Sequence, residues 1–447
     1  MPDLETSFPE PPRPQPTGRL IVTFDPGRDV AEARNIIQNQ AGIRALDIRE
    51  LGDRPLDPPS PGGAEGGFVF SRFGVAVIET GGDTSIRAAS LATVDGVRSV
   101  RPEFYLFAIS ELERRYADWV RAGLALLIEG GPRGSDVVPA ATRMRTRPAR
   151  AGEPGVYADT DRWTWGLAAV GANQSPLTGK GVRAAILDTG LDLEHPDFKG
   201  RPIVARSFVP DGTVMDVQGH GTHTAGTLAG PSVSKIGRRY GVAPDVSLHI
   251  GKVLDDGGSG TEADILRAVN WAIDSKCAVI SMSLGRPTQL DEAPDPLYEE
   301  VGSAALREGC LIVAAAGNES ARSFGYVAPV GAPANSPSIM AVAAVDPRLA
   351  VAPFSCGGLA GRGGEVDISG PGTLVYSSFP RPRLARPLQG TSMACPHVAG
   401  VAALLAETDP GLRGRRLWDR LIELSREIGP TRDYGSGLVQ VPPSVGA

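Results

Sequence analysis

The sequence predicts an α/β protein in which a mainly parallel sheet, covered on both faces by helices, follows a smaller α+β module. Two observations lead to this prediction. Beyond about residue 163, helical segments separate short stretches that are apolar throughout, at residues 182–188, 246–254, 278–284, 311–317 and 339–345. Strands that are apolar on both faces are typical of parallel sheets buried between helices. Upstream, residues 19–109 follow the order βαββαβ, which is a split βαβ (ferredoxin-like) module.

The small module is predicted from strand composition and from helix end signals. Its expected strands are residues 19–24, 45–51, 74–80 and 97–109. One helix is expected to begin at Asp29 and to stop at Gly42, and a second to lie near residues 85–93. Residues 55–67, between the middle strands, contain too much proline and glycine for regular structure, so we expect a loop there.

Shifts in composition divide the chain into four parts. We expect a proline-rich leader at 1–18, the small module at 19–109, a helical and basic linker at 110–160, and the α/β domain at 161–447. The linker contains the arginine-rich run RMRTRPAR. Such a run is either a solvated stretch or a site of proteolytic processing.

Charge and composition exclude several classes of partner. A net charge of −6 and a pI near 5.6 provide no basic field for nucleic acid or for an anionic membrane. The acidic N-terminus has no secretory signal pattern, and no early apolar run approaches the roughly 20 residues that span a bilayer. We therefore expect a cytoplasmic protein, or a secreted one if a leader has been trimmed. The four cysteines lack metal-ligand spacing and are expected to be free thiols.

Three segments place a reactive side chain at the end of a predicted element. Asp188 ends the strand in ILDTG, His220 opens a helix in GHGTHTAG, and Ser392 opens another in GTSMACPHVAG. In open α/β sheets, sites form where strands end and helices begin, so these side chains can converge. A serine hydroxyl needs an imidazole to take its proton, and the imidazole needs a carboxylate to fix its tautomer. The residue types predict a catalytic triad.

Donors for an oxyanion are predicted beside the nucleophile. The helix that begins at Ser392 offers backbone N–H groups at its N-terminus. Asn318 follows an apolar strand in LIVAAAGNES, where its amide can donate to a developing negative charge. Together they would form the two halves of an oxyanion hole.

The segments ILDTG, GHGTHTAG, AAGN and GTSMACPHVAG resemble, in this order, the signature segments of the subtilisin-like serine proteases. The resemblance covers about residues 163–441 and includes GVAPDVSL, ISMSLG and DYGSGLVQV. It implies a three-layer α/β/α domain that hydrolyses peptide bonds of proteins or peptides through an acyl-enzyme and requires no cofactor. The same match makes His220 the base and leaves His223, His397 and Cys395 with structural roles.

The resemblance also places substrate contacts. The edges that would pair with an extended substrate are Gly258, Ser259 and Gly260 on one side and Ser283, Leu284 and Gly285 on the other. Gly331 resembles the base of the main specificity pocket. Glu319 falls where the family can place a carboxylate at the pocket rim, which predicts that large apolar and also basic residues are accepted. A solvent-exposed glutamate without this role is the alternative.

A structural calcium ion is a further expectation from the resemblance. Asp197, in EHPDF, matches a position that binds calcium in many relatives. The loop that would supply more oxygen atoms, GPSVSKIGRRYG, departs from the family pattern and carries Lys235, Arg238 and Arg239. The sequence therefore leaves both a calcium site and its absence open.

The small module resembles the inhibitory propeptide of the same family in element order and in the run VDGVRSVRPEF. This resemblance implies a prodomain that acts as an intramolecular inhibitor, with its C-terminal tail in the substrate cleft. Cleavage is expected after Ile109 or nearby, or later at the arginines of the linker. Three functions remain open: an endopeptidase, a peptide-binding pseudoprotease, and an acyl transferase or peptide cyclase. No feature of the sequence indicates an oligomeric state.

Overall fold

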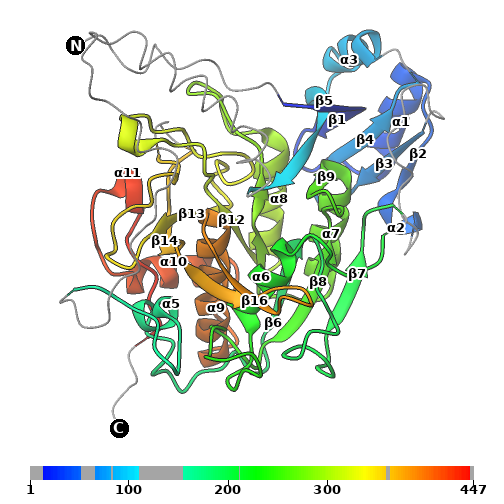
Figure 1. The fold of residues 1–447 in the computed structure, drawn as a ribbon. Coiled ribbons are helices and arrows are strands. Elements are labelled where there is room, and N and C mark those ends of the chain that lie inside the picture. The colour runs from blue at the N-terminus through cyan, green and yellow to red at the C-terminus, as the bar shows by residue number, and fades with distance from the viewer. Residues whose placement is uncertain are drawn as a thin grey trace, which may run out of the picture.

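The computed structural model describes residues 14–51, 66–81, 84–109, 155–210, 212–358 and 363–442. A large α/β unit follows residue 155, and a smaller α+β unit, formed by residues up to 109, lies beside it (Figure 1). The expected linker helix and arginine cluster, and most of the leader, lie outside the described residues. None of the helices in the described ranges is long and apolar enough to cross a membrane.

A seven-stranded sheet forms the centre of the large unit, and every pairing within it is parallel. From edge to edge its strands are β14 (Ile368–Pro371), β13 (Met340–Val345), β12 (Leu311–Ala315), β10 (Val279–Met282), β6 (Arg183–Asp188), β8 (Ser247–Lys252) and β7 (Val204–Ser207). Five of these strands lie within the five apolar segments predicted from the sequence. The strand order reverses beside β6, and ligands of open α/β sheets bind at such reversals.

Helices cover both faces of this sheet (Figure 1). Ala184 and Ile186 of β6 face one apolar core together with α6 (His220–Ala229) and α9 (Thr391–Thr408). Ala185 and Leu187 face the other core with α7 (Glu262–Asp274) and α8 (Pro296–Arg307). The alternation along one strand shows why the segment is apolar throughout, as predicted. The result is the expected three-layer α/β/α arrangement.

Shorter elements complete the large unit. They are α5 (Trp165–Ala169), η3 (Arg322–Phe324), the hairpin of β15 (Val375–Ser378) and β16 (Ala385–Leu388), α10 (Arg415–Leu424), and α11 (Thr431–Tyr434). The buried helix α9 is apolar on all sides from Met393 to Ala406, apart from His397, which is typical of a helix enclosed by a core.

The small unit has the elements β1 (Pro16–Phe24), α1 (Val30–Ala41), β2 (Ala45–Asp47), α2 (Ile48–Leu51), β3 (Gly66–Phe70), β4 (Val75–Glu79), α3 (Thr84–Ala92) and β5 (Val97–Ala108). Its strand order is β5-β1-β4-β3-β2. The predicted ends of α1 are those observed. The Asp29 side chain accepts from the Glu32 N–H at 2.8 Å, and Gly42 ends the helix at φ 71°, where a glycine is favoured.

The predicted strand at 45–51 is wrong in its second half. Only Ala45–Asp47 is a strand, and the chain then turns into the short helix α2, where the Asp47 carboxylate accepts from the backbone N–H of Arg49 at 2.9 Å. Strand β3, Gly66–Phe70, pairs with β4 on the side away from β1. Its first two residues are glycines at the end of the predicted loop, so sequence reasoning missed it.

Strand β5 joins the two units. Its C-terminal part leaves the small unit and pairs antiparallel with β9 (Ser259–Thr261) and with β11 (Leu284–Gly285) of the large unit (Figure 1). Leu106 lies opposite Gly260, and Ala108 lies opposite Leu284. One strand thereby lies between two edges that flank the carboxyl end of β6.

Candidate active site

Asp188 and His220 meet at the carboxyl end of β6. Asp188 is the last residue of this strand, and His220 is the first residue of α6. The Nδ1 atom of His220 lies 2.8 Å from Oδ1 and 3.0 Å from Oδ2 of Asp188. A carboxylate only accepts hydrogen bonds, so Nδ1 carries the proton and Nε2 is the basic nitrogen of the neutral ring. Both side chains are about 1% exposed, which strengthens the pairing by excluding water.

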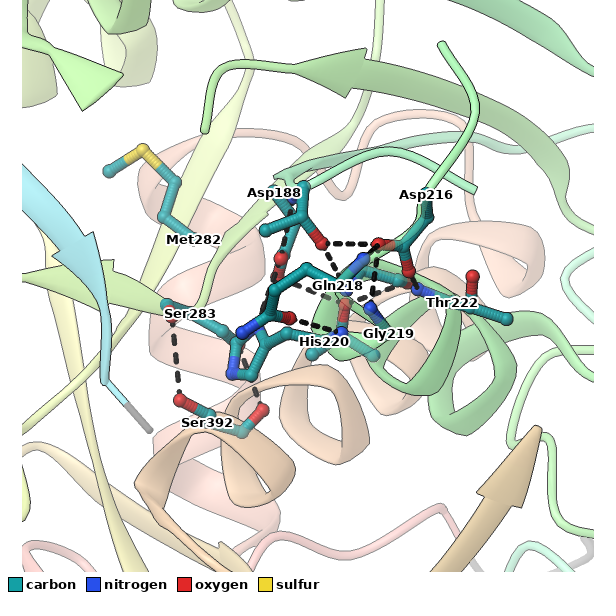
Figure 2. A network of polar contacts seen from close by, with 12 residues as sticks. Asp188, Asp216, Gln218, Gly219, His220, Thr222, Met282, Ser283 and Ser392 are labelled. Atoms are coloured by element: carbon teal, nitrogen blue, oxygen red, sulfur yellow. Dashed lines mark hydrogen bonds and ion pairs between the residues drawn. The ribbon is translucent and has the colours of Figure 1, made fainter. Parts of the chain in front are cut away.

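Ser392 lies on the other side of the imidazole. It is the second residue of α9, and His220 lies between it and Asp188 (Figure 2). Two hydrogen bonds fix the serine against the β10–β11 segment. Its Oγ donates to the carbonyl of Ser283 at 3.4 Å, and the Ser283 hydroxyl donates to the carbonyl of Ser392 at 2.8 Å. The three residues expected to act together are therefore brought together.

Asn318 is held beside the start of α9. Its Oδ1 atom accepts from the backbone N–H and from the hydroxyl of Thr391, both at 2.9 Å. This arrangement turns Nδ2 toward Gly390, where a Cβ atom would lie only 2.9 Å from that nitrogen. Gly390 adopts φ 141°, so both its conformation and its close approach to Asn318 require glycine. The amide donor and the helix N-terminus converge next to Ser392.

The predicted substrate edges are occupied by β5. The carbonyl of Gly258 accepts from the Ala108 N–H at 2.9 Å, and the carbonyl of Ser283 accepts from the Ile109 N–H at 3.4 Å. Gly285 passes close to Ile109, whose Cδ1 atom lies 3.3 Å from the position of a Cβ on that glycine. The six residues predicted for these edges thus lie along an extended strand, as a bound peptide would require.

Gly331 lies against backbone atoms, since a Cβ there would be 2.6 Å from the carbonyl oxygen of Arg286. Glu319 is buried, so the alternative of a solvent-exposed glutamate is wrong. Its Oε2 atom accepts from the thiol of Cys356 at 3.1 Å. Burial is the largest influence on this carboxyl and raises its pKa, and the thiol hydrogen bond opposes that shift.

The residues around Asp197 do not fit a calcium ion. Asp197 Oδ1 accepts from the backbone N–H of Lys235 at 2.6 Å, and Oδ2 accepts from the hydroxyls of Ser234 at 2.7 Å and Tyr240 at 2.6 Å. The ammonium of Lys235 donates to the carbonyl of Pro196 at 2.9 Å. Calcium needs six to eight oxygen lone pairs turned toward it, whereas here donors occupy them. Within the described ranges, no group of three or more acidic, histidine or cysteine side chains could hold a metal.

The other histidines and Cys395 form structural contacts. The ring nitrogen Nε2 of His223 contacts the carbonyls of Val375 and Arg386, and Nδ1 of His397 donates to the carbonyl of Met393. Burial lowers the pKa of His223 to about 3 and that of His397 to about 4, so both rings are neutral. Burial raises the pKa of Cys395 to about 11, which keeps this thiol protonated. All four cysteines are free and buried.

One buried carboxylate near the triad was not anticipated. Asp216 accepts from backbone N–H groups at the start of α6 and from the Thr189 hydroxyl. The signal was present in the sequence, because Asp216 precedes His220 by four residues and the residue at the helix start, Gly219, has no side chain to cap the helix.

Comparison with known proteins agrees with this geometry. Residues 179–437 match the Subtilase family of peptidases, which is more than half of the chain, so the protein belongs to the subtilase family. Subtilisin E from Bacillus subtilis (strain 168) is 40% identical over 266 residues, which are 59% of this chain and 65% of the relative. Subtilisin Savinase from Lederbergia lenta is 39% identical over 279 residues, which are 62% of this chain and 96% of the relative.

The solved structure of sphericase superposes with a TM-score of 0.53 at 33% identity and covers 62% of this chain and 98% of its own. This likeness agrees with the three-layer fold described above. The chain spans about two thirds of the length of Subtilisin E. Neither these relatives nor the fold support the expected cytoplasmic location.

The neutral buried histidines predict a loss of stability in acid. The ordinary pKa of His397 is 6.5 and its folded pKa is about 4, so between these values only the unfolded chain takes up the proton. The contribution of the neutral His397 ring to the free energy of unfolding is therefore complete above about pH 6.5, and it is lost as the pH falls toward about 4. His397→Gln should therefore show a smaller loss of unfolding free energy between pH 7 and about 4.5, by roughly 2–3 kcal/mol.

Urea unfolding in a Ser392→Ala background, which prevents self-digestion, measures this difference. Between pH 7 and pH 8 the free energy of unfolding should change equally with and without His397→Gln, because the His397 ring is uncharged in both the folded and the unfolded chain. Equal losses on acidification would contradict the prediction.

Proposed function

We propose that the chain is a serine endopeptidase that hydrolyses peptide bonds through an acyl-enzyme. The observation that carries the proposal is the Asp188–His220 hydrogen bond beside Ser392, with an extended strand lying across the site. His220 Nε2 takes the proton of the Ser392 hydroxyl as the oxygen attacks the substrate carbonyl, and then passes it to the leaving amine. Asp188 holds the tautomer and stabilises the imidazolium. Asn318 and the N-terminus of α9 donate to the oxyanion.

We further propose that residues 19–109 form a prosegment that blocks the site. The hydrogen bonds of Ala108 to Gly258 and of Ile109 to Ser283 place β5 as a substrate would lie. The N–H of Ile109 shares the Ser283 carbonyl with the Ser392 hydroxyl, so Ile109 lies beside the nucleophile. This position makes Ile109 the residue before the bond to be cut. Of the two expected processing sites, the one after Ile109 is favoured.

Buried charges support tight docking of this prosegment. The carboxylate of Glu262, at the start of α7, accepts two hydrogen bonds from Arg101 at 2.7 and 2.9 Å and one from the Phe104 N–H at 2.9 Å. In return, the carboxylate of Glu103 accepts from the N–H of Ala263 at 2.8 Å. Both carboxylates are fully buried. Because these hydrogen bonds add to the backbone pairing of β5 with β9 and β11, we propose that the prosegment stays docked and that the intact chain is latent.

Purification of the wild-type chain and of Ser392→Ala tests the function. The wild type should shorten itself so that its new N-terminus is residue 110, and it should then cut a generic peptide substrate. Ser392→Ala should remain intact and inactive, because the nucleophile is missing. Mass spectrometry measures both proteins and the peptide products.

Three other results of this experiment would contradict the proposal. An uncut peptide in the presence of the processed wild type would indicate a peptide-binding pseudoprotease, and joined rather than shortened products would indicate an acyl transferase. Cleavage by Ser392→Ala would show that the central assignment is wrong.

For specificity, we propose that large apolar residues are preferred before the scissile bond and that basic residues are accepted increasingly as the pH rises. Ile109 occupies this position with its side chain against Gly285. Glu319 attracts a basic residue only when ionised, and its raised pKa delays ionisation. The ratio of cleavage at arginine to cleavage at leucine should rise as the pH increases above the usual titration range of a glutamate, since arginine stays charged throughout. In Glu319→Gln the ratio should stay constant, and an identical rise in both proteins would exclude Glu319.

We also propose that Lys235 holds the loop around Asp197 without a metal. Its backbone N–H binds the Asp197 carboxylate, and its ammonium binds the Pro196 carbonyl. The Tm of the Ser392→Ala protein should agree within about 1 °C in calcium and in chelator, because a ligand that does not bind the folded chain does not stabilise it. Lys235→Ala should lower the Tm equally in both. A rise of several degrees in calcium alone would contradict the proposal.

A further inference from the structure

The general base His220 is the first residue of α6, where the helix has no hydrogen-bond acceptors of its own for its N–H groups. Gly219, which precedes it at φ 101°, has no side chain to accept them. Instead, the side chains of three other residues accept from the backbone N–H groups of the four residues 219–222. Asp216 accepts from Gly219 at 2.8 Å and from Thr222 at 2.7 Å, Gln218 accepts from His220 at 2.8 Å, and Thr189 accepts from Gly221 at 2.8 Å.

Asp216 is the centre of this network (Figure 2). Its Oδ1 atom also accepts from the Thr189 hydroxyl at 2.9 Å and from the Gln218 N–H at 3.1 Å, and the residue is 3% exposed. Thr189 directly follows Asp188 in the chain, and its N–H donates to the Asp188 carboxylate at 2.7 Å. A single buried carboxylate therefore connects the end of β6, which carries Asp188, to the start of α6, which carries His220.

The hydrogen-bond donors around Asp216 fit an anion, whereas burial and the charge of Asp188 favour the protonated form. Every hydrogen bond described for its carboxylate comes from a donor. Burial is the largest influence on its pKa and raises it, with the charge of Asp188 acting in the same direction, and the N–H donors lower it. The buried ammonium of Lys252 donates to the carbonyls of Thr189 at 2.8 Å and Met215 at 3.1 Å, so it holds the backbone beside both ends of the network.

We propose that Asp216 is a positioning residue for the general base: its carboxylate fixes the first turn of α6 against the end of β6, and thereby fixes the His220 imidazole between Asp188 and Ser392. The inference rests on the proposed function as a serine peptidase. Asp216 acts through His220, since none of the hydrogen bonds described for it reaches the substrate edges at β9 and at residues 283–285. Its removal should therefore affect turnover more than substrate binding.

The substitution Asp216→Asn tests this role in the mature, processed enzyme. One oxygen of the carboxylate becomes an NH₂ group that faces the N–H of Gly219 or of Thr222, so a donor meets a donor. We expect kcat to fall about 10–100-fold, since displacement of a catalytic group by about 1 Å has effects of that size, while KM changes less than about twofold. The acid limb of the pH profile of kcat should move to lower pH, because an anion near the imidazolium is removed.

Asp159→Asn is the matched control. Asp159 accepts from the Trp165 N–H at 2.8 Å at the start of α5, so it also caps a helix N-terminus, and none of its described contacts involves the triad. This variant should lower the Tm without altering kcat, KM or the pH profile. If Asp216→Asn behaves in the same way, with only the Tm reduced, Asp216 is structural and the proposal is overturned.

A second measurement covers the case in which Asp216→Asn fails to mature. In the full-length Ser392→Ala chain, proton NMR detects the Nδ1 proton of His220 that is shared with Asp188. Asp216→Asn in that background should shift or broaden this resonance, and an unchanged resonance would overturn the proposal. The two proposals can fail independently. Cleavage of substrate by Ser392→Ala would contradict the proposed function. An active wild type together with an unchanged kcat in Asp216→Asn would contradict only the positioning role of Asp216.

Discussion

The hydrogen bond between His220 and Asp188 is the interaction on which the site depends, and the fold is arranged to make it. Asp188 can be held in place because β6 is a central strand, paired on both sides and covered by helices on both faces. His220 meets it because α6 begins at the same edge of the sheet, beside the reversal of strand order. Both side chains are almost fully buried, and a charged hydrogen bond is stronger where water is excluded.

The same edge of the sheet explains why the small unit docks where it does. Strand β5 adds its backbone between β9 and β11, and this pairing needs no particular side chains. Selectivity for this one strand comes from its charged anchors, because Arg101 and Glu103 exchange hydrogen bonds with the start of α7. A substrate that lacks these anchors would use the same backbone pairing with fewer contacts. In the function proposed here, self-inhibition and substrate binding are two uses of one cleft.

Much of the architecture could be predicted because local signals and tertiary packing agree. The apolar segment that ends at Asp188 is a strand buried on both faces, and Asp29 and Gly42 cap α1 as their residue types require. The prediction failed at residues 48–51, where a local hydrogen bond from Arg49 to Asp47 favours a helical turn over the strand. Strand β3 was missed because its opening glycines are turn residues in isolation and gain strand character only by pairing with β4.

At the site, residue types indicated the chemistry, and the structure added the contacts that orient it. The sequence pointed to Asp188, His220, Ser392 and Asn318 by their positions at element ends. It did not indicate that Glu319 turns inward to Cys356, or that Lys235 fills the surroundings of Asp197 with donors, because both depend on loops that pack together. Asp216 differs from these, because its contacts with Gln218, Gly219 and Thr222 are local in the chain, and only its contact with Thr189 depends on a distant segment.

The most direct test of the account is labelling with a fluorophosphonate, which reacts with an activated serine hydroxyl. Peptide mapping of the processed protein should find a single adduct on Ser392, and the full-length chain, in which β5 covers that residue, should react far more slowly. Labelling should disappear in His220→Ala, because the hydroxyl then has no base. An adduct on another serine, or equal labelling of His220→Ala, would contradict the assignment of the triad.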